Sequence, residues 1–202
     1  MKKFILLAIA SILTNLVSAQ RVEVTPTFGY TFSGTVKGYY GTYDVQNAML
    51  YGAKLDVEFI DLTYFELSYR RNDPTLEYIT SSQIHKEANT GTAHYMAGVL
   101  RELNNGTFRP YGVINLGLTR YWDKGDSDFR KWFFSTEFAI GTKIFITDNL
   151  GFRFQASVTT PWDFDGGGIY WGIGGGSSAN LTFGVPIAHW DLSGGIIISL
   201  PD

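Results

Sequence analysis

The sequence predicts an all-β chain, and more closely an eight-stranded antiparallel up-and-down transmembrane β-barrel. After residue 20, eight segments alternate apolar and polar residues with the period of two that is typical of strands. The connections between the segments alternate between long and short. Charged residues make up 17% of the chain and aromatic residues 16%, whereas a typical soluble domain is about 25% charged. This composition excludes intrinsic disorder and a basic protein that binds nucleic acid.

Residues 1–19 have the pattern of a signal peptide. Lys2 and Lys3 make a positive start, an apolar stretch runs from Phe4 to Val17, and Val17-Ser18-Ala19 offers small residues for signal peptidase. We therefore expect Sec export across the inner membrane, cleavage after Ala19 and a barrel domain of residues 20–202. The chain has no cysteine, which excludes a lipoprotein anchor and a disulfide scaffold.

The first three segments alternate clearly. Residues 22–33 are apolar at the even positions from Val22 to Phe32, and residues 49–59 are apolar at the odd positions. Residues 64–70 set an apolar face of Phe65, Leu67 and Tyr69 against Tyr64, Glu66, Ser68 and Arg70. Each of these segments is therefore predicted to be a strand with one apolar and one polar face.

The fourth and fifth segments, residues 93–103 and 108–122, alternate less clearly. We assign Tyr95, Ala97 and Val99 to the apolar face of the fourth, and Ile114, Leu116 and Leu118 to that of the fifth. Clear alternation returns in residues 132–144, 150–159 and 189–200. Their apolar faces contain Trp132, Phe134, Phe138, Ile140 and Ile144, then Leu150, Phe152, Phe154, Ala156 and Val158, then Trp190, Leu192, Ile196, Ile198 and Leu200.

The connections predict an up-and-down meander. Residues 60–63, 104–107 and 147–149 are short and built around Asn, Asp and Gly, as tight hairpin turns require. The other four connections are predicted to be long loops, at residues 36–48, 72–92, 123–130 and 163–186. Short turns and both termini then lie at one end of the barrel, and the four loops lie at the other.

Alternation alone leaves open which face is inside. A soluble lipocalin-like barrel that binds a ligand has its apolar face inside, whereas an outer-membrane barrel has it outside. The polar face here is rich in Gly, Ser and Thr, which suits a crowded lumen better than a surface in water. Aromatic residues near strand ends, such as Trp122, Trp132 and Trp190, are typical of a membrane girdle. These features favour the membrane barrel, with the lipocalin-like barrel as an alternative.

Nine charged residues of the polar faces form the candidate site. Charges that are buried in a narrow lumen must be paired, so we expect an interstrand ion-pair network that plugs the lumen. Rings of charge also tune pores, and a narrow pore for ions or small solutes is the alternative. The nine residues are Glu23, Lys54, Asp56, Glu58, Glu66, Arg70, Glu137, Lys143 and Arg153.

Enzyme chemistry has few candidates in this sequence. His85, His94 and His189 are the available imidazole bases, and none is followed by a serine two residues later, the spacing found in lipid A deacylases. We therefore expect no catalytic residues, with a lipid A hydrolase or acyltransferase as the enzymatic alternative. The acidic clusters lack the spacing of an EF-hand, and we expect neither a metal site nor a cofactor.

The last predicted loop is rich in glycine. Eight glycines lie between residues 166 and 184. Exposed aromatic residues on such a loop are costly unless they bind something. The candidates for a loop contact are Ile169, Tyr170, Trp171 and Ile173.

Two phrases of the chain resemble a known family. Pro110-Tyr111-Gly112, followed by residues 115–118, and the strand-turn-strand phrase of residues 141–153 resemble the small OmpA/OmpX-like outer-membrane β-barrel domains of Gram-negative bacteria. The resemblance implies a location in the outer membrane and a structural or interaction role, with four loops displayed outside. It implies contact with outer-membrane lipids and lipopolysaccharide, and with another envelope protein through the loops or the lipid-facing surface. Such chains often end in an aromatic residue, whereas this one ends Ser199-Leu200-Pro201-Asp202.

Overall fold

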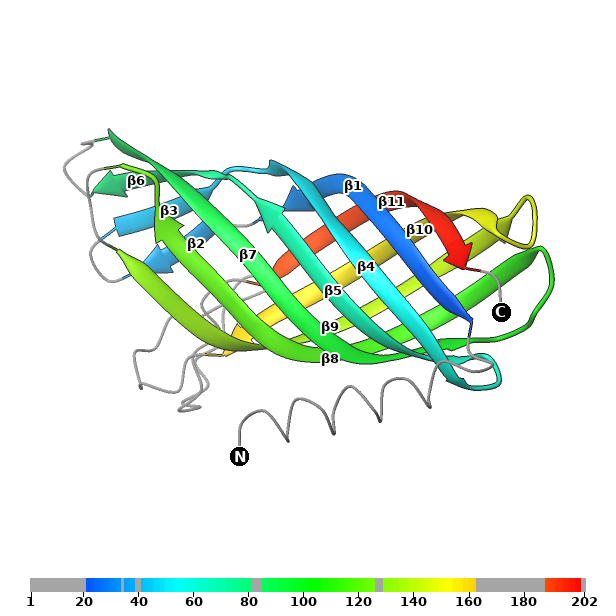
Figure 1. Cartoon of the computed structure of the whole chain (residues 1–202). Coiled ribbons are helices and arrows are strands. Elements are labelled where there is room, and N and C mark those ends of the chain that lie inside the picture. The colour runs from blue at the N-terminus through cyan, green and yellow to red at the C-terminus, as the bar shows by residue number, and fades with distance from the viewer. Residues whose placement is uncertain are drawn as a thin grey trace, which may run out of the picture.

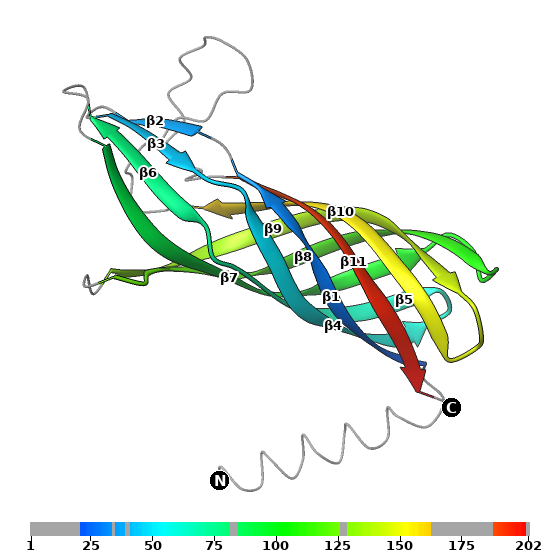
Figure 2. The same ribbon diagram turned by 90° about the horizontal axis from the view of Figure 1, so that it is seen from above.

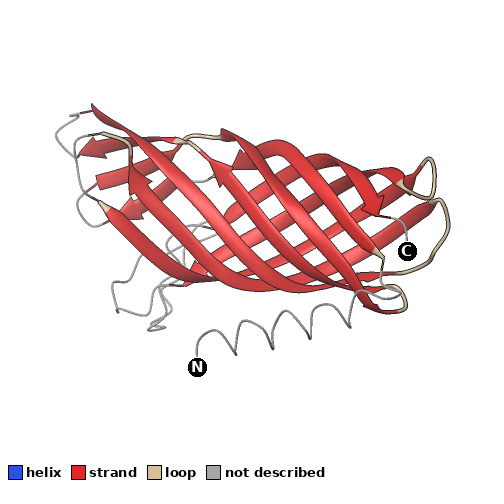
Figure 3. Cartoon of the chain, in the orientation of Figure 1, coloured by secondary structure: helices blue, strands red, loops and turns tan. Residues whose placement is uncertain are grey.

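The computed structural model describes residues 21–33, 35–38, 41–80, 85–125, 129–162 and 188–200. Within these ranges the regular elements are strands (Figure 3), and no helix there is long and apolar enough to cross a membrane. The predicted signal peptide lies outside the described residues and stays a prediction. The strands are β1 (Val22–Phe32), β2 (Thr35–Gly38), β3 (Gly41–Val45), β4 (Ala48–Ile60), β5 (Thr63–Asn72), β6 (Thr75–Thr80), β7 (His85–Glu102), β8 (Phe108–Asp123), β9 (Arg130–Phe145), β10 (Leu150–Trp162) and β11 (His189–Leu200).

A closed barrel is formed by β1, β4, β5 and β7 to β11 (Figure 1). Neighbours around the ring follow the order β7-β5-β4-β1-β11-β10-β9-β8, and the pairing of β7 with β8 closes it. All of these pairings are antiparallel. The predicted eight-stranded antiparallel barrel is confirmed.

The barrel has an apolar outer wall and a polar lumen. Neighbouring residues show the change of face: Thr27 is 1% exposed and Phe28 68%, while Ala139 is 5% exposed and Ile140 71%. Successive side chains of a strand point to opposite faces, so one alternating sequence supplies both surfaces. A soluble lipocalin-like barrel has the reverse arrangement, and this alternative is therefore wrong.

Two of the predicted loops are strands. Residues 36–48 contain most of β2 and all of β3, and residues 72–92 contain β6 and the first part of β7. These strands form an antiparallel sheet in the order β2-β3-β6-β7, which continues past the barrel wall at the end opposite the short turns (Figure 2). We call β2, β3, β6 and residues 85–89 of β7 the outer extension. Backbone pairing there continues without the apolar and polar alternation that marks the barrel strands.

Lumen glycines have a backbone role. A Cβ on Gly52 would lie 2.0 Å from the carbonyl oxygen of Tyr69, and one on Gly117 would lie 2.0 Å from that of Tyr95. Both carbonyl groups belong to a neighbouring strand. The strands therefore approach too closely at these two points for a residue with a side chain.

Candidate functional site in the barrel lumen

Lys143 of β9 is the centre of the ion pairs at the inner end, where the short turns lie. Its Nζ is 2.6 Å from Oε2 of Glu23, 3.0 Å from Oε1 of Glu102 and 3.1 Å from Oδ2 of Asp56. The same ammonium group lies 4.3 Å from the centre of the Tyr64 ring. Three carboxylates from β1, β4 and β7 thus meet one lysine, and all four of these charged side chains are buried.

Two arginines close this inner end. Nε of Arg21 lies 2.9 Å from Oε1 of Glu23, and Nη1 of Arg109 lies 3.4 Å from Oε2 of Glu102. Both guanidinium groups also stack on the ring of Phe145, at 4.3 and 4.4 Å from its centre. These two cations balance the excess of carboxylate around Lys143 and place the ring of Phe145 between them.

Arg153 of β10 joins the next group of charges toward the middle of the lumen. Its Nη1 donates to Oδ2 of Asp56 at 2.9 Å, and its Nη2 pairs with Oε2 of Glu66. The other carboxylate oxygen of Glu66 accepts from Nζ of Lys54 at 3.0 Å and from the amide of Asn115 at 2.8 Å. Asp56 therefore connects this group to Lys143, so the two groups form one continuous network.

Arg70 of β5 holds the outer half of the lumen. Its guanidinium group pairs with Glu137 of β9 and with Oδ2 of Asp191 of β11, the latter at 2.6 Å. It also donates to the hydroxyl groups of Ser157 and Thr159, at 3.0 and 2.9 Å. Arg70 thereby connects strands across the lumen that are not neighbours in the wall.

Two buried histidines lie beyond Arg70. The rings of His94 and His189 are 5.3 Å apart. Nδ1 of His94 is 2.8 Å from the hydroxyl of Thr119, and Nε2 of His189 is 2.6 Å from the hydroxyl of Tyr121. The hydroxyl of Thr119 bonds in turn to Ser135 at 2.7 Å. Each imidazole is therefore hydrogen-bonded to a hydroxyl group rather than directly to a serine nucleophile.

The structure brings eight of the nine predicted residues together, with Glu58 as the exception. Glu58 is half-buried at the inner rim, and its carboxylate accepts the backbone N–H of Leu62 at 3.0 Å. Leu62 has a φ of 59°, and the register of β4 and β5 shifts between Glu58 and Ile60. Glu58 lies two residues before the end of β4, and its carboxylate is bonded to the turn that follows the strand.

Sequence reasoning missed Glu102, Asp191, Arg21 and Arg109 as members of the network. Glu102 and Asp191 have the position parity of lumen residues on their strands, so this signal was present in the sequence. Arg21 and Arg109 lie at strand ends, where the parity of a position does not indicate whether its side chain faces the lumen or the outside. The predicted loop contacts Ile169, Tyr170, Trp171 and Ile173 lie outside the described residues and stay a prediction.

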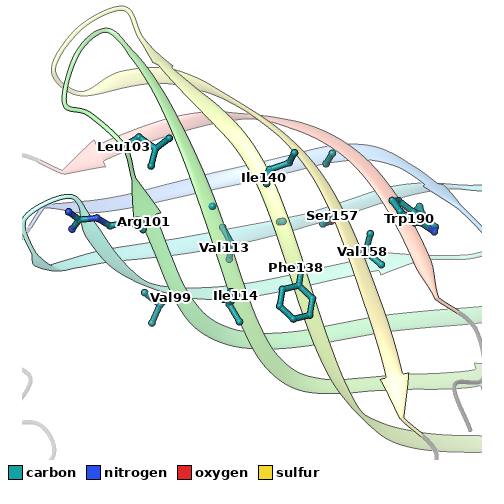
Figure 4. Close-up of a pocket in the computed structure, with 13 residues that line it drawn as sticks. Val99, Arg101, Leu103, Val113, Ile114, Phe138, Ile140, Ser157, Val158 and Trp190 are labelled. Atoms are coloured by element: carbon teal, nitrogen blue, oxygen red, sulfur yellow. The ribbon is translucent and has the colours of Figure 1, made fainter. Parts of the chain in front are cut away.

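Two hollows lie outside this network. An apolar groove of about 630 Å³ crosses the outer wall from β7 to β11, with Arg101 and Leu103 toward its inner end and Trp190 at the far side (Figure 4). A polar hollow of about 580 Å³ lies at the outer rim, lined by Asp73, Asp123, Lys124, Gly125 and residues 87–90. The groove is part of the apolar wall, whereas the polar hollow lies beside the outer extension.

No family profile and no curated protein sequence matches the chain. Solved structures do match: outer membrane protein OprG from Pseudomonas aeruginosa has a TM-score of 0.64 at 12% identity, over 91% of this chain and 97% of that chain. Neisserial surface protein A (NspA) has a TM-score of 0.58 at 13% identity, over 90% of this chain and 97% of that chain. The fold is that of the small outer-membrane barrels. The resemblance indicated by the sequence is thus confirmed at the level of fold.

Proposed function

We propose that the chain is an integral outer-membrane protein with a closed lumen, exported by the Sec pathway, whose role is structural or interaction-based rather than transport or catalysis. The observation that carries this proposal is the combination of an apolar outer wall with a lumen filled by paired charges. Each part of the proposal is supported by a different surface of the barrel.

The outer wall supports the membrane location. Large apolar side chains such as Phe28, Met49 and Ile140 are between 68% and 75% exposed. A soluble protein rarely exposes a continuous apolar surface, whereas a membrane barrel covers it with lipid. Short turns at one end and longer connections at the other match the inner and outer ends of such barrels.

The lumen supports a closed barrel. Lys54, Arg70, Lys143 and Arg153 are each at most 1% exposed. A channel filled with water would leave the charged groups along it accessible to solvent. An eight-stranded lumen is only wide enough to be filled by side chains, and the ion pairs fill it from the inner end to Asp191 in the outer half.

The outer end supports an interaction role. The outer extension continues the sheet beyond the wall, and the polar hollow beside it contains Asp73, Glu87, Asp123 and Lys124. Such polar groups can hydrogen-bond to water in the free protein and to another molecule's polar groups in a complex. We place contacts with another envelope protein at this end, and contacts with lipids and lipopolysaccharide along the wall.

Refolding tests the membrane location. We expect urea-unfolded residues 20–202 to aggregate on dilution into plain buffer and to fold on dilution into detergent micelles. The folded form should migrate differently from the boiled form on a gel, because the closed hydrogen-bonded barrel resists detergent until it is heated. A stable monomer in plain buffer would contradict the proposal.

Planar-bilayer recording tests the closed lumen. We expect the refolded protein to give no steady conductance above that of the lipid alone, because the buried side chains of Lys143, Arg153 and Arg70 occupy the lumen. Boiled protein from the same preparation serves as the control for leakage caused by unfolded chains. A large, steady conductance from the refolded sample would favour the narrow pore instead.

A further inference from the structure

Two arginines of the outer wall stand close together near its outer end. Arg71 of β5 lies opposite Ala93 of β7, and Ala93 lies opposite Arg120 of β8. Arg120 in turn lies opposite Trp132 of β9. The small side chain of Ala93 thus stands between the two arginines on this face.

The indole of Trp122 lies against the backbone of Gly91, where a side chain would be. The two residues are paired across β7 and β8, and a Cβ on Gly91 would come within 2.2 Å of the Trp122 indole. Any other residue at position 91 would displace the ring. The position of the indole therefore depends on a glycine at position 91 of β7.

Both guanidinium groups stack on this indole. The guanidinium carbon of Arg71 lies 4.9 Å from the centre of the Trp122 ring, and that of Arg120 lies 5.2 Å from it. Arg120 also lies 5.5 Å from the centre of the Trp132 ring. These distances are within the range of cation–π contacts, which hold the guanidinium plane without using its N–H groups.

The donors of this pair of arginines are incompletely used. Nε of Arg120 is buried and has no hydrogen-bond partner among the residues that the structure describes. Arg71 bonds to Asp73 through long contacts of 3.2 to 3.4 Å, and Asp73 also pairs with Lys124 at 2.8 Å. Arg130 lies opposite Trp122 on β9. In this part of the wall and the adjoining polar hollow, the cations Arg71, Arg120, Lys124 and Arg130 outnumber the carboxylates Asp73, Glu87 and Asp123 by one.

The position of Arg71 and Arg120 along the barrel axis indicates which part of the lipid layer they face. The next outward-facing row toward the inner end contains Tyr69, Tyr95, Leu118 and Phe134, and these side chains are between 37% and 46% exposed. Tyr69 packs on Tyr95, and Tyr95 packs on Trp132. Aromatic rings of this kind mark the boundary between hydrocarbon and head groups. The arginines just beyond them stand at the height of the lipid head groups.

We propose that Arg71 and Arg120, positioned by Trp122, form a binding site for a phosphate group of outer-leaflet lipopolysaccharide. A guanidinium group offers paired N–H donors that match two phosphate oxygens. The acyl chains of the same molecule would lie along the apolar wall on the inner side of the two arginines. The aromatic row is the first part of that wall. This site rests on the proposed membrane location and on the outer end being the one with the extension.

A titration in detergent micelles tests the site. Diphosphoryl lipid A is added to the refolded mature protein, and binding is followed by the fluorescence of its tryptophans. We expect saturable binding, and we expect R71Q/R120Q to weaken it about ten-fold or more, because charge-assisted hydrogen bonds to the phosphate are lost. R120K should weaken it less, since lysine keeps the charge and loses the paired donors. R101Q is the matched control, because it removes an outward arginine at the inner end of the wall.

Three outcomes would overturn the phosphate site itself. They are unchanged binding by R71Q/R120Q, equal loss of binding by R101Q, and equal binding of dephosphorylated lipid A by the unmodified protein. Equal affinity for phosphatidylglycerol would assign the site to phospholipid phosphate and so contradict the choice of lipopolysaccharide. The change of gel mobility on boiling is recorded for every sample first. A chain that fails this check contradicts the membrane location, whereas a folded chain without phosphate-dependent binding contradicts the site alone.

Discussion

Replacing Arg153 by alanine is expected to lower the free energy of unfolding by about 3–5 kcal/mol, the usual cost of removing one partner from a buried ion pair. Arg153 contacts both Asp56 and Glu66, and all three side chains are at most 1% exposed. Without the guanidinium group, Lys143 and Lys54 remain as the cationic partners of these carboxylates. Urea unfolding of the refolded protein in lipid vesicles measures the change.

Two further variants make the measurement specific. Lys124 pairs with Asp73 at the rim, where both side chains are about a third exposed, and its replacement by alanine should cost no more than about 1 kcal/mol. R153A combined with D56N should be more stable than R153A alone, because Asp56 is a carboxylate that lost its guanidinium partner, and Lys143 keeps Glu23 and Glu102 when Asp56 is neutralised. If K124A and R153A proved equally mild, the lumen network would not be the buried, paired arrangement described above.

The barrel and its faces could be predicted because lipid imposes a strict rule on the strands. Outward residues such as those from Phe65 to Tyr69 must be apolar because they face lipid. The two faces of the strand can therefore be recognised as alternating apolar and polar residues in the sequence. The outer extension was not predicted because strands beyond the membrane do not need an apolar face toward lipid. β6 and the start of β7 lie past the wall, and their sequence around Glu77 and Glu87 shows no single apolar face.

The members of the ion-pair network could be predicted better than its pairs. Parity places Arg153, Asp56 and Glu66 in the lumen, but it does not say which of them meet. Arg153 stands on β10, and its partners stand on β4 and β5, across the lumen rather than on a neighbouring strand. These contacts depend on the stagger of all eight strands, which no local stretch of sequence contains. Glu58 is a different case. Its position parity on β4 is that of a lumen residue, but its carboxylate bonds to the adjacent turn at Leu62.

Replacing Phe154 by arginine is expected to lower the free energy of unfolding by about 2–4 kcal/mol, the cost of an arginine on the lipid face near the middle of a bilayer. Phe154 is 53% exposed on the outer wall, between the buried lumen residues Arg153 and Gln155. In water, an exposed phenylalanine could be replaced by arginine at little cost. A large decrease in the free energy of unfolding would therefore show that position 154 faces lipid. Urea unfolding in vesicles again measures it.

Depth along the wall provides the control for this substitution. Met49 is also outward and is 75% exposed, but it is the second residue of β4 at the outer end. An arginine at that level reaches the head groups, and M49R should cost only about 0–1 kcal/mol. Equal losses from F154R and M49R would mean that depth has no effect, and the wall would then not face a bilayer. A large loss from F154R alone requires a hydrocarbon layer around the middle of the barrel, because both variants add the same charge to an exposed position of the outer wall.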